Sequence, residues 1–155
     1  MKIVSWNINS LRRRQDRLFV WLEATKPDIV CLQETKCPDD QFPALALQAS
    51  GYHSAYHGEK SYNGVAILTK IELRDVRPSL CDEVADPQAR VIAATVDRLR
   101  VFSIYAPNGQ AVGSSAYASG TRVRGPLFSR SAGRRFTAPP VAEFRDRQKR
   151  CASWP

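Results

Sequence analysis

The apolar residues in the first part of the chain form short groups that are separated by turn residues. Residues 2–8 alternate between apolar and polar side chains, which predicts a strand with two different faces. Residues 11–25 then carry apolar side chains at helical spacing, after an N-cap candidate at Asn9-Ser10 and before the helix-stopping pair Lys26-Pro27. The chain is therefore predicted to begin with a strand and a helix.

The second predicted strand, residues 28–34, has an unbroken apolar run, which predicts burial on both faces of a sheet. Residues 38–50 predict a short helix. Further strand-like segments follow, and Asp97-Arg98 predicts a tight hairpin between the last two; the segments are residues 51–57, 63–70, 89–97 and 99–107. This order predicts an α/β fold with a mixed sheet and helices on one face of it.

The last part of the chain shows neither a strand period nor a helix period. Residues 115–155 hold nine Lys and Arg against two Asp and Glu, so they carry +7 of the net charge of +8. We expect a folded domain over residues 1–117 and a basic, disordered tail over residues 118–155. The preference for Arg over Lys favours an out-of-frame reading that begins near residues 115–120, and an evolved basic arm is the alternative.

Composition limits the class of protein. No apolar run is long enough to span a membrane and the N-terminus is too polar for a signal peptide, so we expect a cytoplasmic protein with no membrane partner. The four cysteines form no C-x-x-C pair, which favours reduced thiols. His53 and His57 lie four residues apart, but no nearby cysteine or paired carboxylate completes a zinc site.

Polar side chains follow three of the predicted strands. If the first two strands are parallel neighbours, Asn7 and Glu34 emerge side by side at their carboxyl ends. An amide and a carboxylate suit Mg²⁺, although the two residues would equally serve to cap strand ends. Tyr105 and Asn108 also lie where a predicted strand passes into a loop. A tyrosine hydroxyl there can donate to a charged oxygen, but a half-buried Tyr beside a turn is the simpler interpretation.

Four short motifs occur together in this order: WNIN, LQETK, YNGVAIL and YAPNG. The chain from Met1 to about Tyr117 resembles the N-terminal half of the exonuclease III family of abasic-site endonucleases, which belongs to the endonuclease/exonuclease/phosphatase superfamily. The resemblance implies half of a four-layer αββα sandwich, the DNase I-like fold. It also implies hydrolysis of double-stranded DNA at abasic sites and 3′ ends with Mg²⁺ or Mn²⁺ as cofactor.

The resemblance assigns roles to five residues. Asn7 and Glu34 match the residues that organise and bind the metal, Tyr105 matches the active-site tyrosine beside the scissile phosphate, and Arg90 and Asn108 sit where the family contacts phosphate. The family's remaining ligands and its base lie in a second half, in a Gly-Asp-apolar-Asn motif and a Ser-Asp-His motif. Neither motif occurs here, so we expect this chain to be an inactive fragment.

Two other functions remain open from the sequence. One is a superfamily phosphatase or phosphodiesterase that acts on a small phosphate ester, and the other is a non-catalytic nucleic-acid-binding protein that uses the basic tail. Half a sandwich is also expected to leave the inner face of its sheet bare, which predicts non-specific self-association of the fragment.

Overall fold

The structure is a computed structural model that describes residues 1–78 and 88–107. The chain divides into two compact units, Met1–Tyr105 and Ala106–Pro155, and every helix and strand of the described ranges belongs to the first unit. The predicted boundary near residue 117, the predicted tail and Asn108 lie outside the described residues. Along the described ranges no helix is long and apolar enough to cross a membrane.

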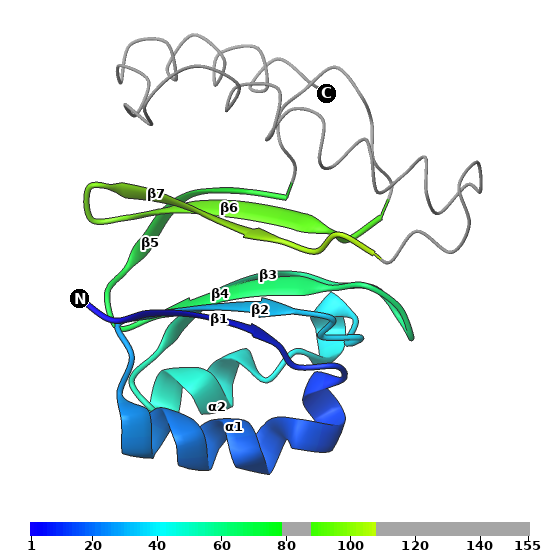
Figure 1. The fold of residues 1–155 in the computed structure, drawn as a ribbon, viewed down its shortest axis with the longest axis horizontal. Coiled ribbons are helices and arrows are strands. Elements are labelled where there is room, and N and C mark those ends of the chain that lie inside the picture. The colour runs from blue at the N-terminus through cyan, green and yellow to red at the C-terminus, as the bar shows by residue number, and fades with distance from the viewer. Residues whose placement is uncertain (79–87, 108–155) are drawn as a thin grey trace, which may run out of the picture. The chain divides into compact units, whose positions relative to one another are not determined.

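The first unit is built from two sheets with helices outside one of them (Figure 1). Its elements, in chain order, are β1 (Ile3–Asn7), α1 (Leu11–Thr25), β2 (Ile29–Gln33), the short 3₁₀ helix η1 (Asp39–Gln41), α2 (Ala44–Ala49), β3 (His53–His57), β4 (Val65–Thr69), β5 (Leu73–Arg77), β6 (Val91–Val96) and β7 (Leu99–Ile104). The strand–helix order predicted from the sequence is confirmed, with the difference that β5 was not among the predicted strands.

The first sheet has the strand order β1-β2-β4-β3. β1 and β2 are parallel, joined by a crossover through α1, and Asn7 stands opposite Gln33 at their carboxyl ends. The other two pairings are antiparallel, so the sheet is mixed, as predicted. The parallel pairing brings the residues that follow β1 and β2 to one edge.

The second sheet has the strand order β5-β6-β7 and is antiparallel throughout. Asp97-Arg98 forms the predicted two-residue connection, because Val96 pairs directly with Leu99. β5 escaped prediction because its middle residues are exposed and two of its side chains are arginines, so it lacks an apolar face of the usual length.

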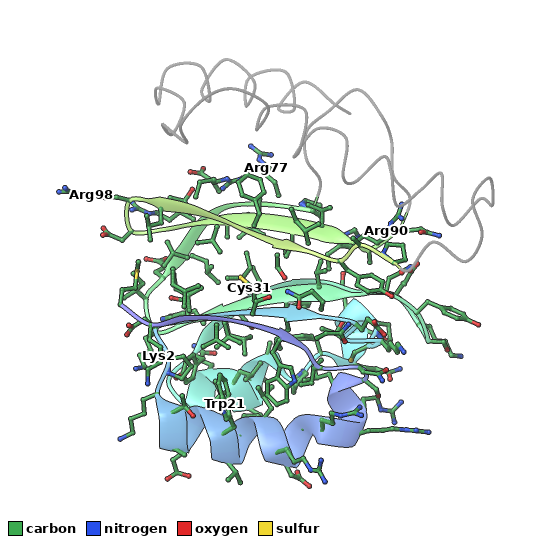
Figure 2. All side chains as sticks on the ribbon, viewed as in Figure 1. Lys2, Trp21, Cys31, Arg77, Arg90 and Arg98 are labelled. Atoms are coloured by element: carbon green, nitrogen blue, oxygen red, sulfur yellow. The ribbon has the colours of Figure 1, made fainter. Side chains whose placement is uncertain are left out.

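Two apolar layers hold the unit together. One lies between the helices and the first sheet, where the rings of Trp6 and Trp21 pack edge to face with their centroids 5.4 Å apart. The other lies between the two sheets, where Cys31 sits among side chains such as Ile67 and Ile92 (Figure 2). The expectation of a bare inner face on the first sheet was therefore wrong, because β5, β6 and β7 cover it. Self-association of the chain stays a prediction, now without that physical basis.

The ends of α1 differ in how well the sequence predicted them. The helix stops at Thr25, and Lys26 adopts the left-handed conformation with φ of 45° while its N–H donates to the Leu22 carbonyl. Ser10 occupies the N-cap position, but its side chain makes no capping hydrogen bond. Its backbone N–H donates instead to the carbonyl of Glu34, at 2.8 Å. The start of α1 is thus anchored to the segment that follows β2.

Candidate functional site

Asn7 and Glu34 meet at the carboxyl edge of the first sheet, as the sequence predicted. The amide Nδ2 of Asn7 donates to Oε1 of Glu34 at 2.7 Å. The amide oxygen of Asn7 accepts the backbone N–H of Asn9 at 3.1 Å. Both partners agree on the orientation of the amide, because a carboxylate only accepts and an N–H only donates. Asn7 therefore holds the Glu34 carboxylate in place.

The loop that carries Glu34 has an unusual backbone. Glu34 and Lys36 both adopt positive φ, at 52° and 48°, a region that few residues other than Gly and Asn visit. Hydrogen bonds on both sides hold this conformation, since the Thr35 carbonyl accepts from Leu11 and the Thr35 N–H donates to Gly64. The rest of the fold thus imposes the conformation of this loop, as is common where backbone strain accompanies function.

Lys36 is a site residue that the sequence analysis did not single out. Its ammonium lies 3.0 Å from Oε2 of Glu34 and 2.8 Å from Oδ1 of Asn9. The quoted LQETK motif contains this lysine two residues after Glu34, and the structure brings the two side chains to the same side. In an extended strand, residues two apart would share a face as well, so alternation was the one signal available.

Tyr105 and Arg90 reach the same place from the second sheet. The Tyr105 N–H donates to the carbonyl of Arg90 at 2.8 Å, and the Tyr105 hydroxyl hydrogen-bonds to Glu34. Arg90 lies at the start of β6, at the end of the sheets away from Lys2 (Figure 2). The structure thus brings together four of the five predicted site residues, and Asn108 lies outside the described ranges.

The electrostatics of the cluster depend on Glu34. Burial alone would raise the pKa of this carboxyl, but hydrogen bonds from Asn7, Lys36 and Tyr105 outweigh it and hold the pKa below its usual value. The pKa of Tyr105 is raised, by burial first and then by the Glu34 charge, while the Arg90 charge opposes both. Glu34 is therefore an anion and Tyr105 a neutral donor at physiological pH.

The residues of this cluster would offer a divalent cation one carboxylate, that of Glu34. Mg²⁺ accepts such a site, because it is often held by one or two carboxylates, several waters and substrate phosphates. Within residues 1–78 and 88–107, no three or more His, Cys, Asp or Glu side chains lie together as a group that could hold a metal. The donor set fits a hard cation that shares its ligands with water and phosphate.

A sequence profile of the Endonuclease/Exonuclease/phosphatase family matches residues 4–151. The chain belongs to this family. It is a family of hydrolases that includes metal-dependent nucleases. The chain is 39% identical over 114 residues to exodeoxyribonuclease III of Haemophilus influenzae, an alignment that covers 71% of this chain and 43% of that protein. This family member thus spans somewhat under half the length of that curated relative.

Solved structures show the same relationship. The chain matches a 3′ phosphatase from Neisseria bound to a product DNA hairpin, with 43% identity and a TM-score of 0.77 over 82% of this chain and 49% of that one. It also matches an AP endonuclease from Archaeoglobus fulgidus, with 35% identity and a TM-score of 0.75 over 82% and 49% of the two chains. The fold is therefore that of the DNase I-like AP endonucleases, of which this family member contains about half.

Proposed function

We propose that this chain contributes half of an exodeoxyribonuclease III-type active site, which hydrolyses phosphodiesters of double-stranded DNA at abasic sites and 3′ ends. The single observation that carries the proposal is the convergence of Asn7, Glu34 and Tyr105. These residues come from both sheets and meet around one ionised carboxylate. The relatives named as DNA-processing enzymes support DNA as the substrate class.

Each residue has a distinct role in this proposal. Glu34 binds the divalent cation, Mg²⁺ or Mn²⁺, which when bound neutralises charge that develops on the phosphate. Asn7 fixes the orientation of that carboxylate through its 2.7 Å hydrogen bond. Tyr105 keeps its proton and donates it to a phosphate oxygen once the hydroxyl turns from Glu34 to the substrate, and the Arg90 guanidinium adds positive charge beside it.

The base that activates water and the further acidic ligands have no candidate in this cluster. We therefore propose that the 155-residue chain alone binds the cation but incises DNA at most weakly. We include in the same proposal a contact of Asn108 with phosphate and of the basic tail, residues 118–155, with DNA. Both lie outside the described residues.

A chimera tests the proposal most directly. Residues 1–107 of this chain replace the matching segment of the Haemophilus influenzae exodeoxyribonuclease III, and incision of a duplex with one abasic site is measured with Mg²⁺. We expect activity in the chimera and a loss of roughly 10³-fold on Glu34→Gln, because the substitution removes the anionic ligand. Duplexes with a 3′-phosphate and small phosphate esters, assayed in parallel, assign the substrate class. A folded chimera without activity on any of them would refute the proposal.

A further inference from the structure

Three donors act on the Glu34 carboxylate in this structure. Asn7 holds Oε1 at 2.7 Å, the Lys36 ammonium lies 3.0 Å from Oε2, and Tyr105 donates its hydroxyl as well. The carboxylate offers about four lone-pair sites, three of them used by these donors, and a divalent cation that binds beside the ammonium is repelled by its charge. Departure of the charged donor therefore favours binding of a cation.

Lys36 is the donor that can leave most readily. Asn7 is itself held through its amide oxygen by Asn9, and Tyr105 is fixed by its backbone bond to Arg90. Lys36 by contrast has a flexible four-carbon stem, and its side chain keeps 31% of its surface exposed. Its second partner, Oδ1 of Asn9, is a neutral acceptor that releases it at small cost.

We propose that the Lys36 ammonium is an internal cation that competes with a divalent ion for the Glu34 carboxylate and would leave it when the ion binds. This inference rests on the proposed function, in which Glu34 is the metal ligand. The displaced ammonium stays near the site, because the backbone of the loop is pinned by hydrogen bonds from Ser10 and Leu11. It then serves as a phosphate contact, a role that a compact point charge performs well.

The consequence is an exchange of partners at one carboxylate. The Lys36 ammonium would leave Glu34 when a divalent ion is bound there, and a phosphate would offer it a new partner. The two ligands therefore bind with positive coupling, and by linkage each tightens the other by the same factor. Without phosphate, Lys36 weakens metal binding, and Lys36 thus suppresses metal loading of the free protein.

Mn²⁺ binding to the full chain, followed by electron paramagnetic resonance, tests the exchange. We expect Lys36→Met to tighten Mn²⁺ binding about threefold or more, because methionine keeps the apolar stem and removes the competing charge. Lys70→Met is the matched control: Lys70 pairs with Asp28 at 3.8 Å, at the opposite end of the first sheet, and its loss should leave Mn²⁺ affinity unchanged. Unchanged or weaker binding in Lys36→Met would overturn the inference.

Two further arms separate this inference from the proposed function. Adding Glu34→Gln to either background must abolish most Mn²⁺ binding; if it does not, the proposed metal role of Glu34 is wrong. If it does, and Lys36→Met still gives no gain, only the exchange is wrong. Thymidine 5′-monophosphate should tighten Mn²⁺ binding in the unaltered chain and tighten it less in Lys36→Met. Equal coupling in both, or none in the unaltered chain, refutes the phosphate role of Lys36.

Discussion

The side-chain amide of Gln33 donates to the hydroxyl of Ser103 across the interface between the two sheets, with 3.4 Å between Nε2 and Oγ. Ser103 in turn donates to the backbone carbonyl of Leu32 at 2.9 Å. Gln33 immediately precedes Glu34, and Ser103 lies two residues before Tyr105. This buried polar link therefore joins the two strand ends that carry the candidate site.

Gln33→Leu should destabilise the folded chain by about 1–3 kcal/mol, because the substitution leaves buried polar partners unsatisfied. The Gln33 NH₂ group also lies 3.1 Å from the Ser5 hydroxyl and 3.2 Å from the Cys31 carbonyl, so three acceptors share its two N–H donors and lose them together. Urea unfolding measures the change. Ser50→Ala, which removes an exposed hydroxyl bonded to the Ala46 carbonyl, is the control and should shift stability by under about 0.5 kcal/mol. An equal effect of both variants would show that the link between the sheets carries no stability.

Gly64→Ala and Gly51→Ala form a matched pair. Both glycines have positive φ, 88° and 82°, so either substitution meets the backbone penalty of about 1 kcal/mol. A methyl group at position 64 would also lie 2.1 Å from the Thr35 hydroxyl oxygen, whereas position 51 has nothing within 4 Å. We expect Gly64→Ala to be the more destabilising by roughly 1–3 kcal/mol in urea unfolding and to weaken Mn²⁺ binding, because Thr35 adjoins Glu34. Equal losses at both positions would contradict the close approach.

Leu18→Ala should destabilise the chain by about 2–5 kcal/mol, because the side chain is fully buried between α1 and the first sheet and its removal leaves a cavity. Val20→Ala on the same helix is the control, since Val20 is 69% exposed and its truncation should change stability by under about 0.5 kcal/mol. Thermal unfolding of both variants measures the difference. Similar stability of the two would mean that α1 does not pack as described.

The Cys31 thiol should resist alkylation in the folded chain. Burial between the sheets raises its pKa to about 11, so at pH 8 only about one thiol in a thousand is the reactive thiolate. We expect iodoacetamide to modify Cys31 at least about a hundredfold more slowly than in the urea-unfolded chain, as read by mass spectrometry of its peptide. Because the pKa is raised, this thiol's contribution to stability is intact below pH 9 and declines as pH rises toward 11. Rapid modification of the folded chain would contradict the cover that the second sheet provides.

Much of the local structure follows from short stretches of sequence. The alternation in β1, the apolar run of β2, the stop at Lys26-Pro27 and the Asp97-Arg98 hairpin were all predicted and are present. These features depend on backbone preferences and on the side-chain period of each element, which act within a few residues. The meeting of Asn7 with Glu34 followed as well, because parallel neighbouring strands share their carboxyl edge.

The remaining features depended on contacts between distant residues. β5 was not predicted because its exposed, charged residues lack the apolar pattern of a strand. The inner face of the first sheet is covered by the sheet that β5, β6 and β7 form together. The ion pair of Lys36 with Glu34 lies in a loop with two positive φ angles, which hydrogen bonds to neighbouring segments hold. The sequence by itself determined the elements and the residue types available to the site. Only the tertiary structure decided which of them share one carboxylate, because backbone strain and ion pairing are set by packing across the whole unit.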